Sequence, residues 1–222
     1  VLINLKKKQA SGTPLRMAVQ GFGNVGSIAA LEAVEDAQNS VVIAVSDVKV
    51  TLYNEEGLDI HKLIQHQRRQ GLLPNTEEEL QEVGITAKIL SPKEILTLDM
   101  DILFLAAAEN QIIETNMKEI KAPLIVEGAN APISQHADDY LNEQGVFIIP
   151  DILANAGGVI VSYLEWKQDR ITELYTEEEV NEEMRKHMQE TFEQVYDNYF
   201  GSDRPYNNIR HTCYQLAVQR LV

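Results

Sequence analysis

Three glycines near the start of the chain, Gly21, Gly23 and Gly26, have the spacing of a phosphate-binding turn. They follow the apolar run Met17–Val19 and precede a helical pattern. In this arrangement the first glycine permits a tight turn, the second lets the backbone approach a pyrophosphate, and the third lets the helix pack against the sheet. The start of the helix adds free N–H groups and a positive dipole end. We therefore predict that a dinucleotide pyrophosphate binds to Gly21, Phe22, Gly23, Asn24, Val25 and Gly26.

An aspartate follows at the distance where dinucleotide-binding proteins carry an acid. The strand predicted over Val41–Ser46 ends next to Asp47, about 20 residues beyond Gly26, where a carboxylate can accept hydrogen bonds from the adenosine ribose. Asp47 is also a common turn residue, and that interpretation stays open. A carboxylate there repels a 2′-phosphate, which favours NAD over NADP. Lys49 lies two residues further on and is able to neutralise such a phosphate, so NADP stays open as well.

Apolar runs and helical patterns alternate through the first two thirds of the chain, which is typical of an α/β fold. Several apolar runs are continuous, as in strands that are buried on both faces. The alternation predicts a Rossmann-type, doubly wound parallel sheet with right-handed crossovers, followed by C-terminal helices. The predicted strands are Leu15–Gln20, Val41–Ser46, Ala87–Leu90, Ile102–Ala106, Leu124–Val126 and Val146–Ile149. The predicted helical segments between them are Asn24–Ala37, Gly57–Arg69, Pro92–Leu96, Asn116–Ile120 and Ser134–Gln144.

The later strands are followed by clusters of small and polar residues. In a parallel sheet such clusters come together at the carboxyl ends of the strands. Ala106 and Ala107 leave room there for a flat ring. Asn110 and Asn130 offer hydrogen bonds to an amide or to a ribose hydroxyl. Each asparagine alone is equally well explained as a cap or turn residue.

After the sheet the chain is predicted to be helical, over Asn155–Gln168, Thr176–Tyr199 and Asn207–Val222. Asn155, Val159 and Ser162 are spaced i, i+4 and i+7, so they share one face of the first of these helices. Such a face suits a small amphipathic substrate, and plain packing of the helix on the sheet is the alternative. We expect a linker or helix remnant over 1–14, a dinucleotide-binding domain over 15–153, and a truncated helical segment over 154–222 that packs on the same domain.

The bulk composition narrows the possible partners. The formal net charge of -15 argues against binding to nucleic acid or to an anionic membrane. No secretory signal and no apolar run of about 18 residues is seen, so we expect a cytoplasmic protein. The single cysteine, Cys213, lies in an apolar helical run and is predicted to be a buried, inert thiol. No residue of the chain is predicted to be catalytic or to bind a metal.

Five segments in their order and spacing carry a resemblance to a known family: GFGNVG, the Val-Ser-Asp strand end, AAAENQI, EGANAP and PDILANAGGVIVSYLEW. Together they resemble the C-terminal, NAD(P)-binding domain of glutamate dehydrogenases, in the Glu/Leu/Phe/Val dehydrogenase family. The resemblance implies oxidative deamination of L-glutamate to 2-oxoglutarate and ammonia. It implies that Ala106, Ala107, Asn110 and Asn130 line the nicotinamide, and that Asn155 lies where cofactor and substrate meet. Val159 and Ser162 would face the substrate, with Ser162 bonded to its distal carboxylate.

The resemblance also sets limits on this chain. The family commonly has proline where this chain has Leu105, and a glycine-containing turn at Val48–Val50. Its catalytic lysine and aspartate lie in a separate N-terminal domain, so we expect this chain to bind dinucleotide without catalysing the reaction. We expect the full-length protein to be a homohexamer and the fragment a monomer or weak dimer. A stand-alone dinucleotide-binding regulatory module and the cofactor domain of another amino-acid dehydrogenase are the alternatives.

Overall fold

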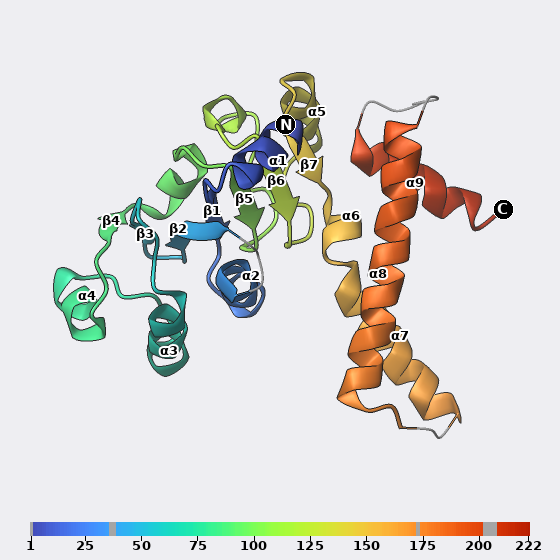
Figure 1. The fold of residues 1–222 in the computed structure, drawn as a ribbon, viewed down its shortest axis with the longest axis horizontal. Helices are drawn as coiled ribbons and strands as arrows, with labels where there is room; N and C mark the ends of the chain where they lie inside the picture. Colours follow the sequence, from blue (N-terminus) through green and yellow to red (C-terminus); the bar gives the residue numbers. More distant parts are fainter. Residues whose placement is uncertain (1, 36–38, 172–173, 202–207) are drawn as a thin grey trace. The chain divides into compact units, whose positions relative to one another are not determined.

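The chain divides into an N-terminal unit, Val1–Ile148, and a C-terminal unit, Ile149–Val222. The first is a sheet with helices, and the second is built from helices (Figure 1). The computed structural model describes residues 2–35, 39–171, 174–201 and 208–222.

The N-terminal unit is organised around one seven-stranded sheet in the order β4-β3-β2-β1-β5-β6-β7. β1 pairs in parallel with β2 and β5, and β5 pairs in parallel with β6. These strands are rich in Val, Ile and Leu because both of their faces are covered. The predicted α/β fold is confirmed. The strands are β1 Leu15–Gln20, β2 Ser40–Ser46, β3 Thr51–Tyr53, β4 Lys88–Leu90, β5 Ile102–Leu105, β6 Leu124–Glu127 and β7 Phe147–Ile149.

One edge of the sheet differs from the prediction. β3 was not predicted, and it runs antiparallel to both β2 and β4, so the sheet is mixed rather than wholly parallel. β3 has only three residues, too few for an alternating pattern to show. Residues 47–50 are too short to return the chain for a parallel pairing, which needs a crossover of a dozen or more residues.

Helices cover both faces of this sheet (Figure 1). One buried cluster joins Val19 and Val45 to α2 and α3, and the other joins Ala18 and Leu103 to η1 and α5. The α-helices are α1 Leu2–Ala10, α2 Asn24–Glu35, α3 Ile60–Gln70, α4 Glu77–Val83 and α5 Gln135–Glu143; η1 Pro92–Thr97 and η2 Met117–Glu119 are 3₁₀ turns.

The start of α3 departs from the sequence prediction. α3 was predicted from Gly57, but it begins at Ile60 because the side chain of Asp59 accepts the N–H of Lys62 and caps the helix. It ends at Gly71, whose φ of 78° lies in the left-handed region that favours glycine. The predicted end of α2, at Ala37, lies outside the described residues.

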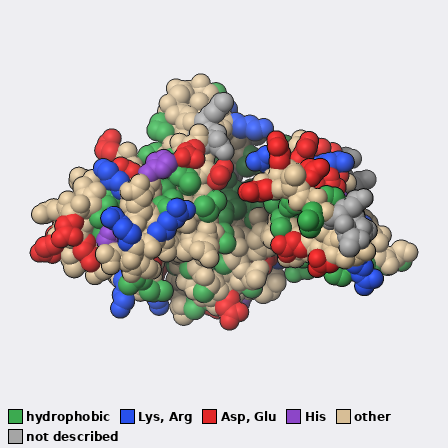
Figure 2. All heavy atoms as spheres, turned by 90° about the horizontal axis from the view of Figure 1, so that it is seen from below, with side chains coloured by type: hydrophobic (Ala, Val, Ile, Leu, Met, Phe, Trp, Pro, Cys, Tyr) green, Lys and Arg blue, Asp and Glu red, His purple; other side chains and the backbone are tan. Residues whose placement is uncertain are grey.

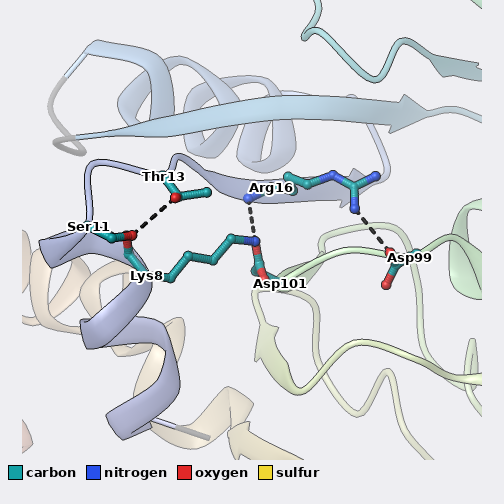
Figure 3. A network of polar contacts seen from close by, with 6 residues as sticks. All are labelled: Lys8, Ser11, Thr13, Arg16, Asp99 and Asp101. Atoms are coloured by element: carbon teal, nitrogen blue, oxygen red, sulfur yellow. Dashed lines mark hydrogen bonds and ion pairs between the residues drawn. The ribbon is translucent and has the colours of Figure 1, made fainter.

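Polar contacts join α1 to the start of β1, at the end of this strand that is opposite the glycine turn (Figure 3). Asp101 accepts hydrogen bonds from Lys8 Nζ (2.5 Å) and from the backbone N–H of Arg16 (2.8 Å) through the same carboxylate oxygen. The Arg16 guanidinium also bonds Asp99 (3.1 Å). One carboxylate thus joins α1, β1 and the residue before β5.

The C-terminal unit consists of α6 Asp151–Ala154, α7 Ala156–Ile171, α8 Glu177–Phe200 and α9 Ile209–Gln219. α6 was not predicted, and Asn155, the predicted first residue of the next helix, caps its end. Thr176 and Glu179 form a capping box at the start of α8, as a threonine followed by a glutamate three residues later predicts. The predicted start of the last helix, Asn207, lies outside the described residues, and Asn208 caps the start of α9.

A spacing of three or four residues along α8 predicts a buried stripe of Val180, Met184, Met188, Thr191 and Val195. The stripe is less buried than this spacing predicts. Val195 is its only buried member in the described helix, and Val180, Met184, Met188 and Thr191 are half-buried. α8 packs on α7 and α9. None of the described helices combines the length and apolarity that a membrane span requires.

Candidate functional site

The backbone of the glycine turn between β1 and α2 packs closely against neighbouring backbone of the N-terminal unit. Gly21 has a φ of 89°, and a Cβ there would lie 2.6 Å from the backbone of Ala107. A Cβ on Gly26 would lie 1.8 Å from the carbonyl oxygen of Gly21. Both positions therefore require glycine, one for its backbone conformation and both for the close approach of the chain.

Gly23 differs from its two neighbours, because a Cβ there would meet no atom within 4 Å. The protein does not fill the space beside this residue. The hydrogen-bond ladder of α2 starts at the N–H of Ser27, which donates to the oxygen of Gly23 (2.9 Å). The N–H groups before Ser27 are thus not used by the helix, and they form the anion-binding end that a phosphate needs.

A cleft of about 580 Å³ opens at this turn, along the carboxyl ends of β2, β1 and β5. It gathers six of the predicted cofactor-binding residues: Gly21, Phe22, Gly23, Asp47, Ala106 and Ala107. Its lining also includes Gln20, Ser46, Val48, Gln67, Gly71, Leu72, Pro92, Lys93, Ala108 and Gln111, which the sequence analysis did not single out. Asn24, Val25 and Gly26 belong to the adjoining start of α2.

Asp47 lines the cleft, but backbone donors already hold its carboxylate. One oxygen accepts the N–H groups of Lys49 (2.7 Å) and Val50 (3.0 Å), and the other accepts that of Leu73 (2.8 Å). Asp47 is therefore a turn residue that shapes the connection from β2 to β3. Its role toward a ribose stays a prediction, and about one of the four acceptor positions of a carboxylate is left for it.

The loops after β5 and β6 are bonded to each other. Asn110, with a φ of 53°, donates its N–H to the oxygen of Ala131 (3.0 Å), and Ile112 bridges to Ile133. Asn110 and Asn130 are exposed on these loops, outside the lining of the cleft. The predicted gathering of the strand ends is present, while contact of either asparagine with a nicotinamide stays a prediction.

Two glutamines lie at the β5 end of the cleft. Gln20 is buried, and its amide nitrogen donates to the side-chain oxygen of Gln111 (2.9 Å), whose own nitrogen donates to the oxygen of Glu109 (3.1 Å). The side-chain oxygen of Gln20 is buried and has no hydrogen-bond partner among the residues that the structure describes. Gln20 could have been predicted from the sequence, because it is a polar residue that follows the apolar run Met17–Val19 and directly precedes the glycine turn.

The remaining predicted residues lie in the C-terminal unit. Asn155 ends α6, and Val159 and Ser162 lie on one face of α7, where both are exposed. That face continues through Tyr163 and Trp166, whose rings stack with centroids 6.0 Å apart. The helical spacing predicted for Val159 and Ser162 is present, and their contact with a substrate stays a prediction.

The N-terminal unit fits a dinucleotide on its own geometry. The protein leaves room beside Gly23 where a pyrophosphate must approach, and the cleft runs from β2 on one side of the turn to β5 on the other. The adenosine half would lie at Asp47 and Val48, and the other nucleoside half at Ala106–Ala108. Among the described residues, no cluster of side chains suits a metal ion.

The sheet order, the glycine turn and the cleft at the strand ends define a Rossmann-type α/β protein. Residues 3–222 match the family model described as Glutamate/Leucine/Phenylalanine/Valine dehydrogenase. The chain belongs to this family.

Three similar proteins show the breadth of the match. The chain is 41% identical over 206 residues to the NADP-specific glutamate dehydrogenase A1 of Halobacterium salinarum, covering 93% of the chain and 47% of that protein. It is 39% identical over 206 residues to the NAD-specific glutamate dehydrogenase A of the same organism, covering 92% and 44%. The hetero-hexameric glutamate dehydrogenase of Thermus thermophilus superposes with a TM-score of 0.81 at 29% identity, covering 99% and 49%. The chain thus spans about half the length of these relatives.

Proposed function

We propose that this chain is the cofactor-binding domain of an NAD(P)-dependent glutamate dehydrogenase. The reaction is the oxidative deamination of L-glutamate to 2-oxoglutarate and ammonia. The observation that carries the proposal is the glycine turn, in which Gly23 alone faces open space while Gly21 and Gly26 are closely packed. Similarity to NADP-specific and NAD-specific glutamate dehydrogenases supports the substrate and both forms of the cofactor.

The cofactor supplies the hydride acceptor, and the residues of this chain hold it in place. The glycine turn and the start of α2 bind the pyrophosphate through backbone N–H groups. Ala106 and Ala107 leave space for the nicotinamide, with Asn110 and Asn130 in the adjoining loops. The chain contributes no catalytic residue in this proposal, so alone it binds dinucleotide and does not turn over glutamate.

The substrate-binding part of the proposal concerns α7. Asn155 would lie where substrate and cofactor meet, Val159 would contact the aliphatic part of glutamate, and the Ser162 hydroxyl would donate to its distal carboxylate. Both α7 residues are exposed, as side chains that meet a substrate must be before it binds. The cofactor domain of another amino-acid dehydrogenase is the alternative, in which Ser162 meets an apolar side chain instead.

The assembly and location of the protein belong to the same proposal. The full-length enzyme is a homohexamer in the cytoplasm, and the chain alone is a monomer or weak dimer. The structural neighbour from Thermus thermophilus is described as hetero-hexameric, which supports a six-subunit assembly. Light scattering measures the state of the 222-residue chain, and a stable hexamer would contradict this part of the proposal.

Titration of the chain with NADH and NADPH tests the central claim. We expect saturable binding in the micromolar to millimolar range, followed by nicotinamide fluorescence or calorimetry, and no turnover of glutamate. Gly23→Val serves as the matched variant, because a side chain there enters the space reserved for the pyrophosphate without touching the protein. Absence of saturable binding to either dinucleotide would refute the proposal.

A further inference from the structure

The β2 end of the cleft contains more positive charge than its sequence motif suggests. Lys93, the second residue of η1, is part of the cleft lining. Lys49 follows Val48, another lining residue, and both lysines are exposed. In the described part of the chain, no carboxylate forms an ion pair with either ammonium group. Both charges are therefore available to a ligand.

The two carboxylates nearest in sequence to these lysines are held by other groups. Asp47 accepts the three backbone hydrogen bonds described above, so N–H dipoles surround its charge. Glu94 accepts the N–H of Ser91 (2.7 Å), and hydrogen bonds from the hydroxyl and the N–H of Ser91 lower its pKa. Both carboxylates thus accept hydrogen bonds from nearby groups of the protein, and neither forms an ion pair with Lys49 or Lys93.

The end of α3 adds to the positive charge on this side. Its last turn carries Arg68 and Arg69, next to the lining residues Gln67 and Gly71. Figure 2 shows Lys and Arg side chains gathered over α3, in the left half of the view. The formal net charge of the chain is -15, and this overall charge repels a phosphate. The cations at the end of α3 oppose that repulsion locally.

We infer that this site selects NADP over NAD, with Lys93 and Lys49 receiving the 2′-phosphate of the adenosine ribose. The inference rests on the proposed function and names which of the two cofactors the cleft prefers. It reverses the preference that Asp47 alone predicted from the sequence. A phosphate monoester carries about -1.5 to -2 charges at neutral pH, so two free ammonium groups match it in charge. NAD presents only a hydroxyl at the same place, and that hydroxyl leaves both lysines without a counter-charge.

Dissociation constants of the chain for NADPH and NADH, measured at one fixed ionic strength, test the inference. We expect NADPH to bind about tenfold more tightly, the size of one charge-assisted hydrogen bond. Lys93→Gln should remove most of this preference by weakening NADPH binding alone, and Lys93→Arg should keep it. Lys49→Gln should have a smaller effect of the same sign. The preference should also fall as salt is added, because the charges lie near the surface.

Lys118→Gln is the matched control, since Lys118 is likewise exposed and is the second residue of a 3₁₀ turn, η2, outside the cleft. It should leave both dissociation constants unchanged. Equal or tighter binding of NADH would overturn the inference while leaving the proposed function intact. So would a preference for NADPH that survives both Lys93→Gln and Lys49→Gln. Failure of both dinucleotides to bind would overturn the proposed function, and the inference with it.

Discussion

The two units of this chain place their proposed functional residues in opposite ways. In the N-terminal unit, six of them line one cleft because the carboxyl ends of β2, β1 and β5 meet at one edge of the sheet. In the C-terminal unit, Val159 and Ser162 lie on the exposed face of a single helix, α7. The first arrangement is fixed by the fold itself, and the second depends on what binds to that face.

Burial explains this difference. Residues of β1 and β2 such as Val19, Ile43 and Val45 are fully buried, so the turns that follow them have little freedom. By contrast, Val195 is the only buried residue that the structure describes in the 24 residues of α8. The buried sheet thus holds backbone groups at the proposed pyrophosphate site, whereas the lightly packed helical unit presents exposed side chains at the proposed substrate site.

The largest effect should come from the glycine turn, and it separates binding from folding. Gly26→Val places a side chain against the oxygen of Gly21, so it should lower stability by about 1–3 kcal/mol or more and also abolish binding. Gly23→Val should weaken dinucleotide binding on the order of 100-fold, or about 2.7 kcal/mol, with an unchanged melting temperature. Thermal unfolding and dinucleotide titration of both variants measure the two quantities. Equal loss of stability in the two variants would contradict the open space beside Gly23.

In the C-terminal unit the largest loss of stability should follow removal of an ion pair. Arg210 Nη1 lies 2.9 Å from Asp151 Oδ1, and the side chains are only 13% and 18% exposed. Arg210→Met leaves the Asp151 carboxylate in this covered position, which should cost about 2–4 kcal/mol in urea unfolding. The exposed pair of His187 and Glu183 is the control, where His187→Gln should cost about 0–1 kcal/mol. Similar costs for the two variants would show that burial does not distinguish these pairs.

The sequence predicted most of the sheet because hydrophobic periodicity carries that information. The bounds of β1 matched, and the start of β2 differed by one residue. Hydrophobic periodicity did not predict β3. This strand follows the turn of residues 47–50, in which the Asp47 side chain accepts the N–H groups of Lys49 and Val50. The motif predicted that Asp47 binds a ribose, and that role stays a prediction. Its third hydrogen bond comes from Leu73, a residue distant in sequence, and no local pattern shows such a contact.

The residues of the candidate site were predictable from the sequence where they directly follow a strand. Residues directly after the strands, such as Gly21 and Ala106, were found because the sheet places them. Gln67 lies in α3 and Lys93 in η1, and their distance in sequence from the glycine turn does not reveal that they line the cleft. In the C-terminal unit, Asn155 was predicted to begin a helix, yet it ends α6, because helix ends depend on caps that single residues decide.

A third test concerns the exposed face of α7 and applies to the full-length enzyme. Ser162→Ala removes one proposed hydrogen bond to the substrate carboxylate, worth about 1.5–3 kcal/mol, so kcat/KM for glutamate should fall roughly 10- to 150-fold. Binding of the dinucleotide should barely change. Norvaline, which lacks the distal carboxylate, should be affected far less. An equal loss for glutamate and norvaline would assign Ser162 to packing and would remove the contrast between the two units.

A fourth test concerns the attachment of α1 to the sheet. Asp101→Ala removes the acceptor for both Lys8 and the Arg16 N–H, which should cost about 1–3 kcal/mol of stability in urea unfolding. Asp99→Ala is the control, because its side chain is 81% exposed and should contribute about 0–1 kcal/mol. Equal costs would show that the backbone hydrogen bond from Arg16 adds nothing.

The smallest expected effect concerns the one thiol of the chain. Burial raises the pKa of Cys213 to about 11, against an ordinary value near 9. The folded state therefore keeps its proton where the unfolded state releases it, so the stabilising contribution is complete below pH 9 and is lost as the pH rises toward 11. Urea unfolding of the chain and of Cys213→Ala between pH 8 and 10.5 should show a steeper loss for the chain with the thiol. Because other groups titrate in this range, only the difference between the two proteins carries the result, and parallel curves would show that the helical unit does not shield its cysteine.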